Sequence, residues 1–566
     1  MPAGVEPEGS RNPEYAQILS ARALVEGQPQ WTSQDIATAN STGAGSVSHA
    51  PEYRFFSSSL ALALVEPYPG ISGSLASPPL SPPVPGETEA KREQENTLYV
   101  RDDEPLQPEG SEQKDYEEAA INGEKMHNAG FIALVTKLDE PGPEFGAIGD
   151  EIAPGIAALG ATPDLDHVVV VSMKAAPGLY EWTGSGVDTL EAVSLLPAGN
   201  TVIPTPAAEL GGLKVEEKGQ ANGGDRHAIS DDGARVFWTR TTKEAGEVGQ
   251  HLYVRDTQLR QTLELSAPGE AEAVFQTANA EGTKVYFTDS QRLTPDSGAA
   301  EDSPNLYVAE VGIVDGKLTK NVTDLTPEAD PRLLVPGSGA VVVAASEEEG
   351  ESGSYVYFVA DGALTRDATP GRCGTIAVAV RPAGTTCNLY VRHYDTADRE
   401  WEPTRLVAAL SAEDLPDWSR DEVYLDSLTS RASPNGRYLA FMSDRSLTGY
   451  DNEDASGHGR LDEEVFLYDA KMGTIVCASC NPSGARPTGV FDTTSVEDGE
   501  GVRLVVDRIG TWSERSDLGL GSGYPDDWLA ASVPGYDPVE AGESPYQSRY
   551  LSNSGRLFFN SADALL

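Results

Sequence analysis

The segment Arg431–Asp469, RASPNGRYLAFMSDRSLTGYDNEDASGHGRLDEEVFLYD, contains the pattern that decides the fold. A polar turn at 433–436 (Ser-Pro-Asn-Gly) precedes an alternating strand at 438–442, and an acidic loop leads to a second strand at 465–469. Asn-Gly is typical of tight hairpins, because a turn residue there must adopt a positive φ. The segment therefore predicts antiparallel strands that are joined by a tight turn and a longer acidic loop.

Weaker copies of this pattern occur along most of the chain. The first strand recurs at residues 54–57, 168–172, 235–239, 284–288, 355–359 and 556–560. The second strand, of Leu-Tyr-Val type, recurs at residues 98–102, 179–182, 252–256, 306–308 and 389–392. A further strand follows in most copies, at residues 192–197, 262–266, 322–326, 405–410 and 474–478. Each unit is therefore predicted to hold about four antiparallel strands, the composition of one propeller blade.

The loops between the copies are long. The aromatic positions of the second strand fall at residues 99, 180, 253, 307, 390 and 466, with gaps from 54 (253 to 307) to 83 (307 to 390) residues. A compact blade needs only ~40–50 residues. We expect an all-β fold, a β-propeller of seven or eight four-stranded antiparallel blades with large loop insertions. Regular strands with irregular loops are typical of a rigid scaffold that varies its rim.

The expected organisation is an N-terminal extension, residues 1–45, followed by the propeller, residues 46–566. The expected blades are 46–140, 155–200, 225–268, 273–328, 332–414, 428–484 and a partial blade 546–566, with an insertion at 485–545. Residues 15–25 (YAQILSARALV) are expected to form either a short amphipathic helix or a linker to an upstream segment, and the proline-rich residues 77–85 to be disordered. Because an open propeller exposes sheet edges, we expect either a fragment or completion of the last blade by N-terminal strands.

The repeat resembles a known family. The turn 433–436, the Leu-Ala-Phe strand at 439–441 and the Phe-Leu-Tyr-Asp strand at 466–469 resemble the TolB-type, WD-like β-propeller repeat. The whole chain also resembles large uncharacterised exported propeller proteins of high-GC actinobacteria, on landmarks such as Leu179–Trp182 and Tyr546–Ser552. The resemblance implies an extracytoplasmic binding scaffold built from repeats, and it implies no defined reaction.

The composition of the chain limits the classes of partner that it can bind. The chain has 566 residues and a formal net charge of −48, which repels phosphate backbones and anionic membranes. We therefore expect no nucleic-acid partner. No apolar run approaches the ~18 residues needed to span a bilayer. The N-terminus lacks the basic and apolar regions of a signal peptide, so either the protein is cytosolic or the chain begins after its export signal, and we expect the second.

Four cysteines form two local pairs, Cys373 with Cys387 and Cys477 with Cys480. Two such pairs favour structural disulfides in an exported protein. The spacing of Cys477 and Cys480 also matches a redox or zinc half-site. No helix is predicted to begin after this pair, so the context of a thioredoxin-type site is absent.

The loop between the strands of the last complete unit contains candidate ligands for a hard cation. Asp451, Glu453, Asp454 and Asp462 offer the carboxylate oxygens that Ca²⁺ prefers. The EF-hand pattern fails, because Ser456 stands where that loop requires glycine. The alternative is a solvated acidic loop without a metal. Calcium is the one cofactor that the sequence suggests.

No catalytic motif accompanies the repeats. The sequence has no HExxH, GxSxG or P-loop motif, and its seven histidines lack ligand spacing. We therefore expect a non-catalytic extracytoplasmic scaffold whose loop rim binds a protein, peptide or glycan. The alternatives are the propeller domain of a larger serine-peptidase-type hydrolase and a calcium-dependent enzyme that acts on polysaccharides.

Overall fold

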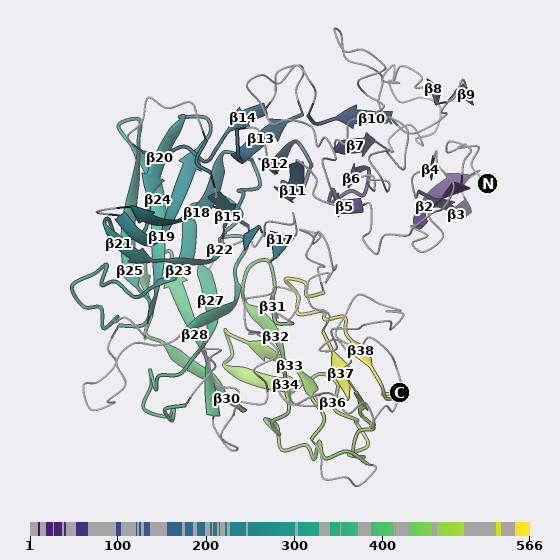
Figure 1. The fold of residues 1–566 in the computed structure, drawn as a ribbon. Coiled ribbons are helices and arrows are strands. Elements are labelled where there is room, and N and C mark those ends of the chain that lie inside the picture. The colour runs from purple at the N-terminus through teal and green to yellow at the C-terminus, as the bar shows by residue number, and fades with distance from the viewer. Residues whose placement is uncertain are drawn as a thin grey trace. The chain divides into compact units, whose positions relative to one another are not determined.

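The structure is a computed structural model in which strands and turns are described and the remaining segments are not (Figure 1). The described residues are 10–11, 18–25, 28–36, 39–40, 53–65, 98–102, 120–121, 124–125, 130–135, 156–172, 176–184, 190–197, 204–206, 208–211, 214–215, 221–222, 227–244, 247–299, 304–327, 340–350, 353–371, 386–411, 414, 429–455, 461–491, 528–533 and 550–565. Strands and turns make up this part of the chain, and no helix in it is long and apolar enough to cross a membrane. The proline-rich residues 77–85 and Cys373 lie outside the described residues.

Chain contacts divide the protein into two compact units, and the first comprises residues 1–222, 231–233 and 539–546. Two four-stranded antiparallel sheets dominate it, in the orders β10-β7-β6-β5 and β11-β12-β13-β14. Their strands are β5 (Tyr53–Phe56), β6 (Leu62–Val65), β7 (Tyr99–Asp102), β10 (Gly130–Ala133), β11 (Ile156–Ala161), β12 (His167–Ser172), β13 (Gly178–Thr183) and β14 (Leu190–Ala192). The smaller strands are β1 (Ser10–Arg11), β2 (Ile18–Val25), β3 (Gln28–Asp35), β4 (Ala39–Asn40), β8 (Ala120–Ile121), β9 (Glu124–Lys125), β15 (Ala208–Leu210), β16 (Lys214–Val215) and β17 (Ala221–Asn222).

The second unit comprises residues 223–230, 234–538 and 547–566 and holds four larger sheets. The first sheet contains β18 (Arg235–Glu244), β19 (Glu247–Asp256), β20 (Gln261–Glu264) and β21 (Glu270–Glu272), with β21 parallel to β19. The others are β22 (Val274–Ala278), β23 (Lys284–Asp289), β24 (Asn305–Val314) and β25 (Lys317–Asp324); β26 (Val341–Ala345), β27 (Ser354–Ala360), β28 (Thr386–Asp395), β29 (Glu400–Trp401) and β30 (Arg405–Ser411); and β31 (Arg431–Ala432), β32 (Tyr438–Ser443), β33 (Glu464–Asp469) and β34 (Thr474–Cys477). Short pairs are β35 (Val490–Phe491) with β36 (Trp528–Leu529) and β37 (Ala531–Ser532) with β38 (Asn560–Ser561).

These sheets confirm the prediction of about four antiparallel strands in each sequence repeat. The predicted second strands are β7, β13, β19, β24, β28 and β33, which lie inside their sheets. The predicted first strands are in most copies the second strand of the sheet, because a strand that the sequence pattern did not reveal precedes them: β11, β22, β26 or β31. Closure of the sheets into a propeller, and the number of blades, remain predictions.

The strand predicted at 54–57 is present as β5, although it forms the edge of its sheet, and β6 lies between it and β7. Two local predictions were wrong. At 556–560 the structure records a bridge from Leu551 to Leu557 and the end of the chain pairs only through β38. The expected helix at 15–25 is instead strand β2 over Ile18–Val25, since pairing with β3 supplies its backbone with partners along all eight residues.

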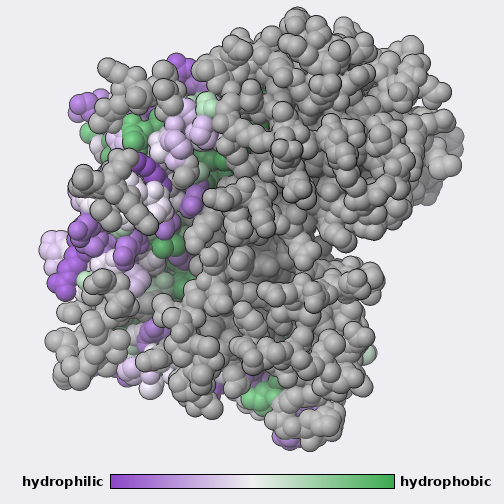
Figure 2. Space-filling view, viewed as in Figure 1, coloured by the Kyte–Doolittle hydropathy of each residue, from purple (hydrophilic) through white to green (hydrophobic). Residues whose placement is uncertain are grey.

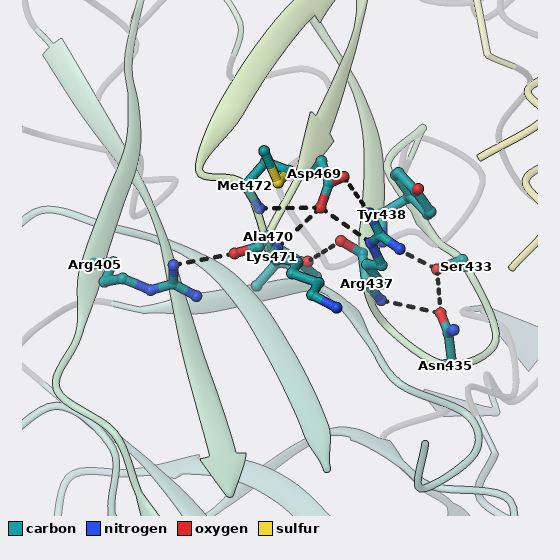
Figure 3. Close-up of polar contacts among 10 residues, drawn as sticks. Arg405, Ser433, Asn435, Arg437, Tyr438, Asp469, Ala470, Lys471 and Met472 are labelled. Atoms are coloured by element: carbon teal, nitrogen blue, oxygen red, sulfur yellow. Dashed lines mark hydrogen bonds and ion pairs between the residues drawn. The ribbon is translucent and has the colours of Figure 1, made fainter. Parts of the chain in front are cut away.

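A polar side chain begins each of seven turns. Its oxygen accepts a hydrogen bond from a backbone N–H that follows the turn, and in five copies this N–H belongs to the first residue of the next strand. The pairs are Ser57 with Leu62, Thr162 with His167, Ser230 with Arg235, Asn279 with Lys284, Ser346 with Tyr355, Ser433 with Tyr438 and Ser552 with Arg556, at 2.7–3.1 Å. Figure 3 shows the Ser433 copy. Each turn therefore satisfies a backbone donor that would otherwise have to find water.

The same turns contain a residue with left-handed backbone. It is Gly436 in the best copy, at φ 72°, whereas Leu60 and Leu165 hold the corresponding position at φ 60° and 62°. Gly436 also lies against the neighbouring sheet, because a Cβ built there would be 1.9 Å from the Ser346 Oγ. Glycine at this position thus allows both the turn and the approach of the next sheet.

Side chains that donate to backbone carbonyls join neighbouring sheets of the second unit. The Tyr357 hydroxyl donates to the Gly436 carbonyl at 2.6 Å, and the Arg405 guanidinium donates to the Ala470 carbonyl at 3.1 Å. One buried apolar cluster, which includes Tyr357, Leu389, Phe441 and Phe466, fills the space between the same two sheets. Apolar burial thus provides contact area, while the buried hydrogen bonds fix how the sheets face each other.

Asp469 closes the turn after β33 (Figure 3). Its carboxylate accepts from the backbone N–H groups of Lys471 and Met472 at 2.9 and 3.2 Å, and from the Arg437 guanidinium at 3.1 and 2.7 Å. The Arg437 hydrogen bonds, together with these backbone donors, hold the pKa of Asp469 below its usual value. Asp395 makes an equivalent turn after β28, accepting from the Ala397 N–H at 2.7 Å.

We predict that Gly436→Ala destabilises the protein more than Gly473→Ala. Gly473 has nearly the same backbone, at φ 64°, but has open space around its Cβ position. The strain of left-handed alanine, about 1 kcal/mol, is common to both variants. Gly436→Ala also requires Ser346 to move, which adds about 1–3 kcal/mol. Urea unfolding measures both changes, and equal losses would contradict the close approach.

We predict that the stabilisation from Asp469 is lost in acid. Because its folded pKa is lowered, its contribution is present above the unfolded pKa and disappears as pH falls through the folded pKa. Asp469→Asn should therefore cost about 1 kcal/mol at pH 7, given the partial exposure of the ion pair, and progressively less as the pH falls below the unfolded pKa and through the lower folded pKa. Asp398→Asn removes a charge from an exposed turn and serves as the control in urea unfolding at each pH. A deficit that stays constant with pH would refute the role of the charge.

Candidate functional site

The structure divides the four predicted calcium ligands into two pairs. Asp451 and Glu453 each form an ion pair with the Arg486 guanidinium, at 2.8 and 2.9 Å. Asp454 and Asp462 are buried, and Asp454 accepts a hydrogen bond from the Gly489 N–H at 3.0 Å. No three of these four described carboxylates bring oxygen atoms within 4.8 Å of one another. A calcium site here stays a prediction. To bind the ion, Asp451 and Glu453 would have to give up their ion pairs with Arg486.

The cysteines that the structure describes are all disulfide-bonded. Cys477 and Cys480 are bonded to each other, with Cα atoms 5.5 Å apart, directly after β34. Cys387 is fully buried on β28 and is also in a disulfide, while its predicted partner, Cys373, lies outside the described residues.

A pocket lies between the second and third sheets of the second unit. It has a volume of about 400 Å³, and its lining comes from β23, β24, β25 and β28 and from the turns near them. The described lining residues are Thr283, Lys284, Glu310, Val311, Gly312, Thr319, Lys320, Asn321, Glu349 and Tyr394. Figure 2 shows mainly hydrophilic side chains on the side of the molecule where Figure 1 places β19, β24 and β25. We refer to this pocket as the inter-sheet pocket.

Sheet register explains why its polar groups meet. Lys284 on β23 is paired with Glu310 on β24, which is paired with Asn321 on β25. Directly paired residues project from the same face of a sheet, so the three form one polar row. Glu349 and Tyr394 come from the facing sheet. The row exists because the second and third sheets pack against each other.

Charges in the inter-sheet pocket are unevenly matched. The buried Lys284 ammonium donates to Glu349 at 3.1 Å and lies 4.7 Å from the centre of the Tyr394 ring. The Lys320 ammonium donates to the Leu265 carbonyl of the first sheet at 2.7 Å. Glu310 accepts from the neutral Asn321 amide at 3.1 Å. Glu349 thus accepts a hydrogen bond from a charged ammonium, whereas Glu310 accepts one from an uncharged amide.

Aromatic side chains lie beneath this polar row. The Tyr286 ring meets the Trp401 ring edge-on at 6.2 Å, and Trp401 also packs against Tyr394. Among the described residues, neither the buried Tyr286 hydroxyl nor the buried Trp401 Nε1 has a hydrogen-bond partner. Burial raises the pKa of Tyr286 well above its usual value, and the nearby Glu349 and Glu310 carboxylates raise it further. Tyr286 is thus a neutral hydroxyl beside acidic groups.

Burial also raises the pKa of Tyr394, with added contributions from Glu310 and Glu349. The chemistry of the pocket is therefore that of carboxylates, an amide, a phenol and a paired ammonium. Its described lining offers no serine, cysteine or histidine to act as an activated nucleophile. The arrangement suits binding of a polar or cationic group better than covalent catalysis.

The four described histidines each lie near a glutamate, with His227 the most distant at 3.9 Å from Glu347. His167 Nδ1 lies 2.9 Å from Glu181, His251 Nδ1 lies 2.7 Å from Glu264, and His393 Nδ1 lies 3.2 Å from Glu402. The hydrogen bond to Glu181 raises the pKa of His167 above its usual value. His251 is fully buried, which is the environment of a structural residue.

Sequence reasoning missed the inter-sheet pocket. The lysine at the start of β23 was an available signal, because Arg235 is also a charged residue at the corresponding position after its turn, whereas Tyr438 takes this position in the Ser433 copy. The sequence did not show that Glu349 and Tyr394 of another sheet face it. These contacts join residues 65 and 110 positions apart (349 − 284 and 394 − 284).

Comparisons with known proteins give no family. No family model matches the chain, and no curated protein matches it in sequence. Among solved structures it is similar to Porphyromonas gingivalis dipeptidyl peptidase 4, with a TM-score of 0.30 and 13% identity over 57% of this chain and 39% of that one. It is also similar to a prolyl endopeptidase, with 0.31 and 12% over 82% and 47%, and to Galerina marginata prolyl oligopeptidase B, with 0.31 and 11% over 83% and 51%.

The matches span about half or less of each of these longer proteins. Similarity at these TM-scores carries no argument about fold or activity. The TolB-type resemblance accordingly remains a prediction from the sequence, and the site must be interpreted from its own geometry.

Proposed function

We propose that this chain is a non-catalytic, extracytoplasmic β-propeller scaffold that binds a peptide segment of a partner protein. The inter-sheet pocket accepts a basic side chain of that segment. The carrying observation is the Glu310 carboxylate, which sits beside the Tyr394 ring and accepts a hydrogen bond from the neutral Asn321 amide. Among protein, peptide and glycan ligands, this chemistry favours a peptide with a lysine or arginine.

The charge of the whole chain supports the same ligand. A formal charge of −48 attracts basic segments and raises their association rate at low ionic strength. Within the pocket, Lys284 is already paired with Glu349, so a second cation meets Glu310. The Tyr394 ring offers an aromatic surface beside the acids, and such rings attract ammonium and guanidinium groups.

Support for an extracytoplasmic location comes from the cysteines. The Cys477–Cys480 disulfide and the bonded Cys387 suit an oxidising compartment. Disulfides are rare in cytosolic proteins because cellular thiols keep cysteines reduced. The serine-peptidase alternative receives no specific support from the pocket, whose described lining contains no serine, cysteine or histidine.

We predict selective binding to basic peptides. The probe is an array of acetylated dodecapeptides in which each lysine- or arginine-containing sequence is paired with a copy carrying norleucine or citrulline instead. Wild-type protein should bind a subset of the basic copies and lose about tenfold or more in affinity for their neutral partners. A charge-assisted hydrogen bond contributes about 1.5–3 kcal/mol, and 1.4 kcal/mol corresponds to tenfold.

Glu310→Gln should weaken binding of the same peptides by about tenfold. Glu348→Gln is the matched control, since Glu348 is exposed, adjoins Glu349 and does not line the pocket. It should leave affinity unchanged. Binding that ignores the basic residue, or that survives Glu310→Gln, would overturn the assignment of the pocket.

A further inference from the structure

A second cluster of ligand-type side chains lies at the end of the fourth sheet of the second unit. One carboxylate oxygen of Glu464 and the sulfur atoms of Cys477 and Cys480 lie within 4.8 Å of one another. It is the one group of three or more His, Cys, Asp or Glu with this proximity among the residues that the structure describes. The predicted calcium ligands contribute no atom to it.

The fold brings the three residues together through one strand pair. Glu464 begins β33, and the register pairs Phe466 of that strand with Cys477 at the end of β34. The chain then turns back over Glu464 through Ser479. The Ser479 hydroxyl accepts a hydrogen bond from the Val465 N–H at 2.8 Å and donates one to Glu464 Oε2 at 2.5 Å. Ser479 therefore fixes the carboxylate beside the cysteines.

The Glu464 oxygen that Ser479 does not contact, Oε1, is the unusual feature. Glu464 is 1% exposed, and its Oε1 has no hydrogen-bond partner among the described residues. A buried carboxylate oxygen without a donor is costly, so such a group calls for an explanation. A ligand that bonds this oxygen would remove the cost.

The cysteine pair already has the backbone arrangement of a chelating loop. The Cys480 N–H donates to the Cys477 sulfur at 3.1 Å, an interaction that also stabilises a thiolate. Both cysteines are partly exposed, so a small thiol has access to the disulfide. The site is thus reachable from solvent on the sulfur side and closed on the Glu464 side.

We propose that reduction of the Cys477–Cys480 disulfide creates a Zn²⁺ site whose protein ligands are the two thiolates and Glu464. A zinc ion with Zn–S bonds of about 2.3 Å and a Zn–O bond of about 2.0–2.2 Å places its ligands roughly 3.5–3.8 Å apart in a tetrahedron. The Glu464 oxygen and the two sulfurs lie within 4.8 Å of one another, so the carboxylate is within reach of such an ion. The sulfurs are bonded to each other in the oxidised chain and must move apart after reduction. Water completes the four-coordinate shell.

The chemical steps balance with an external dithiol as reductant. The dithiol transfers two electrons and two protons to the disulfide, the S–S bond breaks, two protein thiols form, and the dithiol becomes a cyclic disulfide. Zn²⁺ then displaces the two thiol protons to solvent as the Zn–S bonds form. A small-molecule disulfide reverses the step: it accepts two electrons from the two thiolates, takes up two protons and leaves as two thiols, while the protein S–S bond re-forms and Zn²⁺ is released. The site is therefore opened and closed by the redox state of one cysteine pair.

Zinc fits this ligand set better than calcium. Thiolates are soft ligands that select zinc, whereas calcium takes six to eight hard oxygen ligands. The group offers two sulfurs and one buried carboxylate, and the partly exposed cysteine side leaves space for water. The disulfide in the oxidised chain blocks this chemistry, because its sulfurs are bonded to each other.

Metal titration of the full chain tests the proposal. Protein is reduced with a dithiol, desalted without oxygen and titrated with Co²⁺ for thiolate-to-metal absorption, then with Zn²⁺ against a chromophoric chelator. We expect one Zn²⁺ per reduced chain and none in the oxidised chain. Glu464→Gln should weaken Zn²⁺ binding at least tenfold, and the double variant Cys477→Ser with Cys480→Ser should abolish it.

The second cysteine pair provides the matched control. The double variant Cys373→Ser with Cys387→Ser should bind Zn²⁺ like wild type after reduction. Circular dichroism verifies folding of each variant, and Zn²⁺ but not Mg²⁺ should raise the Tm of reduced wild-type protein. Absence of reduction-dependent Zn²⁺ binding overturns the site, and wild-type affinity in folded Glu464→Gln removes Glu464 from it.

Discussion

The sheets of this protein depend on a polar side chain that begins the turn before a central strand. In seven turns a serine, threonine or asparagine oxygen accepts from a backbone N–H that follows the turn, at 2.7–3.1 Å, and in five of them this N–H belongs to the first residue of the strand. The interaction is local in sequence, so it can form before the sheets meet. A second set ends the sheets, where Ser194, Ser266, Thr326 and Ser479 accept from the N–H of Leu179, Leu252, Leu306 and Val465. Strand position and register are thus fixed at both ends.

Packing of one finished sheet against the next creates features that a single sheet lacks. Gly436 lets the Ser346 turn approach, and the Tyr357 hydroxyl reaches the Gly436 carbonyl across the interface. Between the second and third sheets, the same kind of approach leaves the inter-sheet pocket, where Lys284 meets Glu349 and Tyr394. The pocket therefore depends on the sheet interface, and it would be lost if the two sheets separated.

The two proposed sites lie at positions that recur in several sheets, but each site adds different side chains to the repeated position. Lys284 occupies the strand start that Arg235 and Tyr438 occupy in other sheets, and Ser479 belongs to the set that ends the sheets. In the inter-sheet pocket the added element is a facing sheet with Glu349, while at the other site it is a cysteine on either side of Ser479. At Lys284 the repeated hydrogen bond uses only the backbone N–H, and at the other site it uses Ser479, so the Lys284 side chain and the two cysteines take no part in it.

The sequence by itself determined an all-β fold of repeated four-stranded antiparallel units, because alternating strands and polar Gly turns are local patterns. It also identified the central strands, such as β33, from their aromatic residues. It missed strands such as β31, whose two residues are set by pairing with β32, and it mistook β2 for a helix because a short apolar run fits both periods. Only the tertiary structure separated Asp451 from Asp462, placed Glu464 beside Cys477 and Cys480, and brought Glu349 to Lys284. These contacts depend on strand register and sheet packing, which no local spacing encodes.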